Sequence, residues 1–207
     1  MGNRIVIRNE RKEDERTVEE LVRDSFWNVY RPGALEHYLI HVLRNDPLFV
    51  RELDLVMELD GRTAGQVMFM KAKVETDIGE DIPVLTMGPI SVANDLKHRG
   101  LGRILLDDAL LKASSLGYGA VLIEGNITFY GGSGFIYGRE RDIRYKGLPE
   151  GADSSFFLLR ELIPGYLEGK EGVYGPPEGY LIDEKDALEF DKGFPIREKL
   201  RLPGQLI

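Results

Sequence analysis

Residues 90–105 read ISVANDLKHRGLGRIL and join a predicted strand to the strongest predicted helix of the chain. That helix, residues 101–116, carries one apolar stripe at helical spacing, formed by Leu101, Ile104, Leu105, Ala109 and Leu116. Gly100 and Gly102 stand at its start, where glycine permits turns that other residues avoid and lets the backbone approach a ligand closely. The stretch therefore predicts a strand, a glycine turn and a helix in succession.

The same turn has the chemistry of an anion site. Free backbone N–H groups at a helix start point outward and attract negative charge. Lys97, Arg99 and Arg103 add positive charge around the turn. A phosphate-binding turn is the functional interpretation, and a helix start with permissive glycines and solvated cations is the alternative.

Two other phosphate motifs do not fit this turn. A Walker A loop needs G-x-x-x-x-G-K-[ST], and the chain contains no such run. A dinucleotide fingerprint needs G-x-G-x-x-G, and Leu105 occupies the position of the third glycine. The missing third glycine argues against a dinucleotide-binding oxidoreductase domain, as does an antiparallel hairpin expected before the motif.

The pattern around this stretch indicates a mixed α/β fold with a mostly antiparallel sheet. Strands are expected at residues 5–8, 53–59, 64–74, 82–92, 120–123 and 156–162, and helices at 12–26, 35–44, 101–116 and, as a short turn, 128–132. Asp60-Gly61 predicts a hairpin, and Gly88-Pro89 predicts a bulge or splay within a strand. Residues 165–207 are rich in Gly, Pro and charge and are expected to be dominated by loops.

Composition narrows the function classes. The 207 residues include no cysteine, which excludes disulfides, a thiolate zinc site and a cysteine nucleophile. The formal net charge of −8 argues against broad nucleic-acid binding, which needs a basic face. No apolar run approaches a membrane span, and the first residues lack the apolar core of a signal peptide. We therefore expect a cytoplasmic protein without nucleic-acid or membrane partners.

Two motifs resemble the GNAT family of N-acetyltransferases. Residues 97–102 are similar to the family's [Q/R]-x-x-G-x-[G/A] motif between its fourth strand and third helix, although Lys97 replaces Gln or Arg and Asn94 replaces a frequent proline. Residues 121–135, VLIEGNITFYGGSGF, resemble its later strand followed by an aromatic–Tyr and a Gly–Phe pair. Their N-x-x-F-Y-x-x-x-G-F spacing, with Leu162-Ile163-Pro164-Gly165, is similar to the YhbS-like branch of predicted acetyltransferases.

The resemblance covers residues 4–164 and implies a GNAT-like, mixed and mostly antiparallel central sheet, flanked by helices and splayed between strands four and five. It divides the chain into an acetyltransferase domain, residues 1–164, and a loop-rich C-terminal extension, residues 165–207, packed on or near that domain. The extension is expected either to cover the acceptor site or to form a homodimer contact, and the sequence leaves both roles open.

The resemblance also implies acetyl-CoA as cosubstrate and no metal. The expected cofactor-binding residues are Ile90, Ser91, Val92, Lys97, His98, Arg99, Gly100, Leu101, Gly102, Arg103, Asn126 and Tyr130. The coenzyme A pyrophosphate is expected on the backbone amides of residues 98–103. The pantetheine arm is expected beside the backbone near Ile90 and Val92, in a slot opened after Gly88-Pro89.

Tyr130 and Glu124 are the expected catalytic residues. Tyr130 matches the family tyrosine that contacts the leaving thiolate, and a phenol can donate a proton to sulfur; packing in the core is its alternative role. Glu124 is the candidate base, directly or through water, and a surface or paired carboxylate is its alternative. Asn126 is expected to position substrate or water, or to cap the next helix. His37 and His41 lie one helical turn apart and are expected to be exposed, rather than to line the acceptor pocket or bind metal.

These residues predict an N-acetyltransferase that moves acetyl from acetyl-CoA to a primary amine by direct attack in a ternary complex. The alternative is a non-catalytic module on the same fold that binds acyl-CoA and has lost transfer. The acceptor amine, a small molecule or a peptide, is not determined by the sequence.

Overall fold

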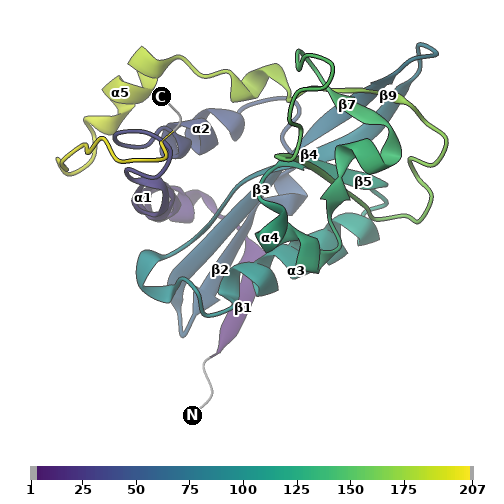
Figure 1. The fold of residues 1–207 in the computed structure, drawn as a ribbon. Helices are drawn as coiled ribbons and strands as arrows, with labels where there is room; N and C mark the ends of the chain where they lie inside the picture. Colours follow the sequence, from purple (N-terminus) through teal and green to yellow (C-terminus); the bar gives the residue numbers. More distant parts are fainter. Residues whose placement is uncertain (1–3, 206–207) are drawn as a thin grey trace. The chain divides into compact units, whose positions relative to one another are not determined.

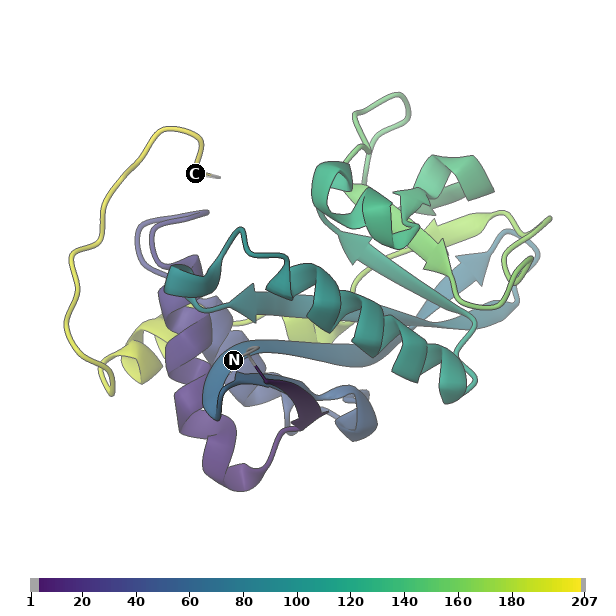
Figure 2. The same ribbon diagram turned by 90° about the horizontal axis from the view of Figure 1, so that it is seen from below.

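The computed structural model describes residues 4–205, which form two compact units. The first unit comprises residues 4–68, 89–105 and 178–205, and the second comprises residues 69–88 and 106–177. Three elements contribute residues to both units: β3 (Arg62–Thr76), β4 (Asp81–Val92) and α3 (Leu101–Ser115). Figure 1 labels the elements, and Figure 2 shows α3 as one continuous helix.

The strands of the first unit pair antiparallel. β1 (Ile5–Asn9) pairs with β2 (Leu55–Leu59), and β2 pairs with the first part of β3. The β2–β3 turn is Asp60-Gly61, whose φ values of 52° and 82° suit a two-residue hairpin turn. The hairpin that the sequence predicts at this dipeptide is confirmed.

Three helices belong to the first unit, α1 (Glu15–Phe26), α2 (Glu36–Leu43) and α5 (Glu184–Asp191), and α2 contacts both of the others (Figure 1). α1 and α2 bury Val18, Val22, Ile40 and Leu43 completely. Both predicted helices are confirmed, with ends that differ slightly from the expected ones.

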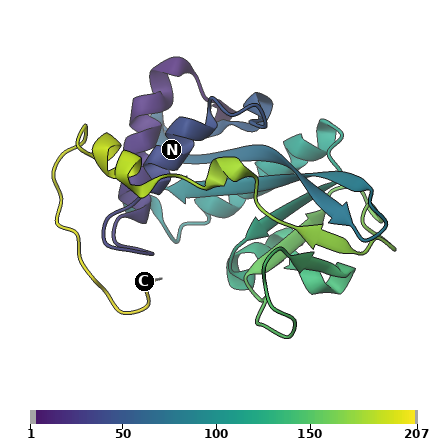
Figure 3. The same ribbon diagram turned by 90° about the horizontal axis from the view of Figure 1, so that it is seen from above.

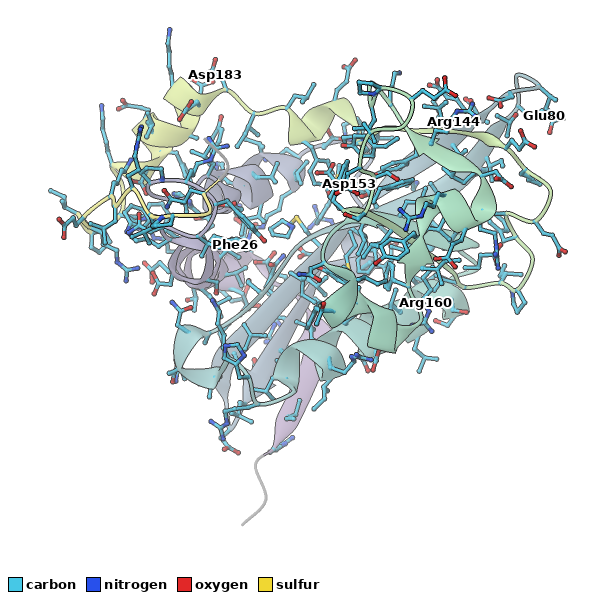
Figure 4. The ribbon with its side chains drawn as sticks, viewed as in Figure 1. Phe26, Glu80, Arg144, Asp153, Arg160 and Asp183 are labelled. Atoms are coloured by element: carbon cyan, nitrogen blue, oxygen red, sulfur yellow. The ribbon has the colours of Figure 1, made fainter. Side chains whose placement is uncertain are left out.

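The tail contains one α-helix that the sequence did not predict, α5, although most of residues 165–205 lies outside helices and strands, as expected. Asp183, labelled in Figure 4, caps the helix by accepting hydrogen bonds from the backbone N–H groups of Lys185 (2.7 Å) and Asp186 (3.2 Å). A helix of 8 residues is marginal alone, so its contacts with α2 stabilise it. The segment that follows α5 is extended, as the yellow trace in Figure 3 shows.

The second unit combines parallel and antiparallel pairs. Its remaining elements are β5 (Ala120–Glu124), α4 (Ile127–Tyr130), β6 (Ile136–Tyr137), β7 (Ile143–Tyr145), β8 (Phe157–Glu161) and β9 (Gly172–Tyr174). β5 and β6 both pair antiparallel with β8, β9 pairs antiparallel with β3, and β7 pairs parallel with β9. The sequence did not predict β6, β7 and β9, because strands of two or three residues are too short to show alternation.

The predicted fold class is confirmed. The hydrogen-bonded strand order is β1-β2-β3-β4-β5-β8-β6, and β4 and β5 are parallel within an otherwise mostly antiparallel sheet. Their register pairs are Leu85–Val121 and Thr86–Leu122, and Gly88, with φ of 147°, follows shortly after them.

The domain boundary predicted between residues 164 and 165 stays a prediction. Residues 165–177 belong to the second unit and residues 178–205 to the first.

Candidate functional site

The glycine turn before α3 has the backbone of an anion cradle. His98 and Gly100 both have positive φ, 61° and 81°. Left-handed residues within such a turn direct successive N–H groups into one concavity, which suits a phosphate oxygen. The α3 hydrogen bonds begin at the Gly100 carbonyl, which accepts from Arg103 N (3.1 Å) and Ile104 N (3.2 Å). His98, Arg99 and Gly100 are exposed, so the turn is accessible to a ligand.

The two departures from the family motif both serve to anchor this turn. Lys97 Nζ donates a hydrogen bond to the Ser25 carbonyl (3.0 Å), and Asn94 Nδ2 donates one to the Asp24 carbonyl (2.8 Å). Both carbonyls lie in the last turn of α1, where helical carbonyls lack partners within the helix. Burial lowers the pKa of Lys97. The ammonium of Lys97 therefore ties the turn to α1, and its contact with a phosphate stays a prediction.

The end of β4, which precedes the turn, is held by backbone contacts. The Val92 carbonyl accepts a hydrogen bond from Ser25 Oγ (2.9 Å), and Ala93 N donates to the Ala64 carbonyl (2.9 Å). Ile90 is half-buried, whereas Ser91 is buried and its Oγ has no hydrogen-bond partner among residues 4–205. A Cβ on Gly65 would lie 2.9 Å from the Ser91 carbonyl oxygen, so glycine there permits the close approach.

The second predicted motif forms a compact corner in the second unit. Asn126 is the N-cap of α4 and accepts a hydrogen bond through Oδ1 from Thr128 N (2.8 Å), which is the capping alternative for this residue. Tyr130 is half-buried and packs edge-on against Phe129 and Phe135, with ring centroids 4.8 and 5.4 Å away. A Cβ on Gly125 would lie 2.4 Å from the Tyr130 ring, so the ring lies directly on the Gly125 backbone.

Glu124 is exposed at the end of β5, and its partner was not identified from the sequence. Tyr145 Oη donates a hydrogen bond to Glu124 Oε1. Burial, and then the hydrogen bond to Glu124, raise the pKa of Tyr145 above its ordinary value. No sequence signal joins these residues, because β7, which carries Tyr145, is too short to be predicted.

A second group of charged side chains lies in the first unit, and all of its members except His41 are buried. Arg44 donates to both carboxylate oxygens of Glu10 (2.7 and 3.0 Å) and to Glu19 (2.9 Å). His41 Nδ1 lies 2.9 Å from Glu19 Oε1. Burial, followed by a hydrogen bond with Glu10, raises the pKa of Asp54 well above its usual range. These five side chains, Glu10, Glu19, His41, Arg44 and Asp54, are called the Arg44 network below.

His37 corrects the expectation that both helical histidines are exposed. Its side chain is fully buried and packs against Phe190 and Phe194, with ring centroids 5.7 and 5.0 Å away. Its Nε2 lies 3.1 Å from Asp191 Oδ1. Burial lowers the pKa of His37 to about 4. The expectation failed because α5, which carries Phe190 and Asp191, was itself not predicted.

The predicted site residues therefore divide between the units. Ile90, Ser91, Val92 and residues 97–103 lie in the first unit, and Glu124, Asn126 and Tyr130 lie in the second. Within residues 4–205, no group of three or more His, Asp or Glu side chains is arranged to hold a metal ion. No helix in this part of the chain is long and apolar enough to cross a membrane.

The chain resembles known proteins over most of its length. The chain is 29% identical over 169 residues to the uncharacterized N-acetyltransferase YhbS of Escherichia coli K12, covering 82% of this chain and 94% of YhbS. The crystal structure of the GNAT family N-acetyltransferase YhbS from Escherichia coli in complex with CoA matches with a TM-score of 0.75 and 28% identity, covering 88% of this chain and 94% of that one. The predicted resemblance to the GNAT family is confirmed.

More distant structures share the GNAT fold. A GNAT family acetyltransferase from Brucella melitensis, crystallised with acetyl-CoA, has a TM-score of 0.67 at 19% identity, covering 86% of this chain and 98% of that one. At this identity the match supports the fold alone. No family model matches the chain.

Proposed function

We propose that the chain is an N-acetyltransferase that moves acetyl from acetyl-CoA to a primary amine by direct attack in a ternary complex. The observation that carries the proposal is the exposed turn of residues 98–100, with two left-handed residues at the start of α3. This backbone fits a pyrophosphate, and the YhbS structure that resembles this chain was solved with CoA. Bound there, acetyl-CoA supplies the activated acetyl thioester.

Each set of predicted residues has one part in the proposed reaction. The N–H groups of residues 98–103 hold the pyrophosphate, and the backbone of Ile90 and Val92 holds the pantetheine arm. Glu124 accepts a proton from the acceptor ammonium, because an amine must be neutral to attack. Tyr130 donates a proton to the leaving sulfur. A cytoplasmic location, and an extension that either covers the acceptor site or forms a homodimer contact, are further parts of the proposal.

The first test is cofactor binding by calorimetry with acetyl-CoA, CoA and NAD. The wild type is expected to bind acetyl-CoA and CoA but not NAD. Gly102→Glu places a carboxylate in the first turn of α3 and is expected to weaken acetyl-CoA binding at least about 100-fold, or roughly 2.7 kcal/mol. Ile78→Glu adds the same charge at a side chain that is 82% exposed in the second unit, and it should bind normally.

Three outcomes distinguish an acetyltransferase from its alternatives. Absence of acetyl-CoA binding by a well-folded wild type would overturn the proposal and leave residues 97–102 as an ordinary helix start. Binding without turnover across a panel of spermidine, L-lysine, kanamycin and an alanine-terminated peptide would favour the non-catalytic module. Turnover that Tyr130→Phe reduces would support transfer.

A further inference from the structure

Two strands of the second unit end in side chains that contact each other. Glu124 is the last residue of β5, and Tyr145 is the last residue of β7. The phenol of Tyr145 donates a hydrogen bond to Glu124 Oε1. Strand register places the two residues beside an aromatic pair, since Glu124 pairs with Phe157 and Tyr145 pairs with Tyr174.

The aromatic neighbours hold the ring of Tyr145 in place. Its centroid lies 5.1 Å from that of Phe156, 5.5 Å from Phe157 and 6.1 Å from Tyr174. Phe157 and Tyr174 are buried and stack on each other, with centroids 5.2 Å apart and planes 7° apart. Packed rings of this kind restrict rotation, so the phenol is a fixed donor.

The fixed donor matters because Glu124 is exposed. A glutamate at a strand end has several rotatable bonds, and water gives it many orientations. A charge-assisted hydrogen bond to a restrained phenol selects one of these orientations. Because the phenol contacts Oε1, the second oxygen, Oε2, is held in one direction.

We propose that Tyr145 is a positioning residue for Glu124 in acetyl transfer. This inference rests on the proposed function, in which Glu124 is the base. An N–H bond of the acceptor ammonium breaks, its electron pair stays on nitrogen, and a new O–H bond forms at Glu124 Oε2. Tyr145 keeps its own proton throughout and fixes the carboxylate that receives the other one.

The test compares kcat and KM for wild type, Tyr145→Phe, Glu124→Gln and the double variant, using acetyl-CoA and the best amine of the panel above. Glu124→Gln is expected to lower kcat about 100-fold, within the usual range for a general base. Tyr145→Phe is expected to lower kcat about tenfold with little change in KM. The double variant should match Glu124→Gln, because both changes affect one group.

The split between kcat and KM separates positioning from a merely structural role. Tyr145→Phe keeps the packed ring and removes only the donor, so a misdirected carboxylate lowers kcat while KM and the free energy of unfolding stay near their wild-type values. Tyr166→Phe is the matched control, because it removes a phenol that donates to the Pro83 carbonyl (2.7 Å) in the same unit. This control is expected to keep the wild-type kcat and KM.

Failure of the two hypotheses gives different results. A wild-type kcat in Glu124→Gln would show that Glu124 is not the base, and it would overturn this part of the proposed function. An inactive Glu124→Gln variant beside a Tyr145→Phe variant with the wild-type kcat would overturn only the positioning role of Tyr145.

A measurement without an acceptor covers the case in which Tyr145→Phe does not fold. Tyrosine ionisation followed by ultraviolet absorbance is expected to show one tyrosine titrating at lower pH in Glu124→Gln than in wild type, because the carboxylate raises the pKa of Tyr145. The same tyrosine titration in Glu124→Gln and wild type would show that Tyr145 does not contact Glu124, and it would overturn the proposal.

Discussion

The Arg44 network in the first unit and Glu124 in the second unit show two uses of a carboxylate. Glu10 and Glu19 are almost fully buried, with side chains 2% and 7% exposed, and both bond to Arg44. Glu124 is exposed and accepts one hydrogen bond from a tyrosine. A carboxylate that is saturated by buried partners cannot reach a substrate, whereas an exposed carboxylate with a fixed orientation can.

A strongly shifted pKa does not by itself mark a functional carboxylate in this protein. Asp54 has a strongly raised pKa, and such groups are candidates for active sites. Asp54 is only 4% exposed, and its neighbours Glu10 and Arg44 are paired with each other. We therefore interpret the Arg44 network as structural and place the proposed chemistry at Glu124.

The largest expected effect tests the structural role of the network. Arg44→Ala leaves Glu10 and Glu19 buried without their partner, and this is expected to lower the free energy of unfolding by about 3–5 kcal/mol. Chemical denaturation measures the change. The kcat of the folded fraction should stay at the wild-type value.

The matched control is Arg62→Ala, which removes an ion pair with Asp95 whose side chains are 60% and 58% exposed. No measurable loss of stability is expected from it. A lower kcat in folded Arg44→Ala would contradict the division between a structural network and a catalytic carboxylate.

The next effect concerns the corner that carries Tyr130. Gly125→Ala introduces a Cβ 2.4 Å from the Tyr130 ring, so the phenol must move. We expect kcat to fall about tenfold, or roughly 1.4 kcal/mol of activation free energy, because a small displacement of a catalytic group costs rate. Steady-state kinetics measure it, and Tyr130→Phe should add little in this background.

Gly131→Ala is the control for that substitution. Its Cβ would meet Ile127 at 3.4 Å, an ordinary contact, and the variant should keep the wild-type kcat. Equal rates for Gly125→Ala and wild type would mean that Tyr130 does not act in the reaction.

The smallest expected effect is a change in the pH dependence of stability. The folded-state pKa of Asp54 is raised above its unfolded value of about 4, so from that pH upward the folded state binds more protons than the unfolded state. The free energy of unfolding therefore falls as pH rises toward the raised pKa. Asp54→Asn cannot titrate and should flatten this slope, by on the order of 1 kcal/mol between pH 5 and pH 6.

Denaturation at several pH values measures the slope for wild type, Asp54→Asn and Asp108→Asn. Asp108 is an exposed aspartate of α3, and its replacement should leave the slope unchanged. A wild-type slope in Asp54→Asn would show that Asp54 is not the group responsible.

The sequence by itself determined the long elements and the two motifs. Apolar periodicity predicted α1, α2 and α3, and Asp60-Gly61 predicted the β2–β3 hairpin, because these signals depend on neighbours a few residues away. The turn at residues 97–102 was predicted for the same reason, since glycines and a helix start give a local backbone geometry.

Only the tertiary structure decided which side chains meet. Tyr145 contacts Glu124 across 21 residues of sequence, and Lys97 reaches the Ser25 carbonyl across 72. His37 is buried by Phe190 and Phe194 of a tail that reads as loop, because α5 is too short to form without its contacts to α2. Local patterns specify backbone conformation, whereas partners distant in sequence are specified by how the elements pack, which periodicity does not record.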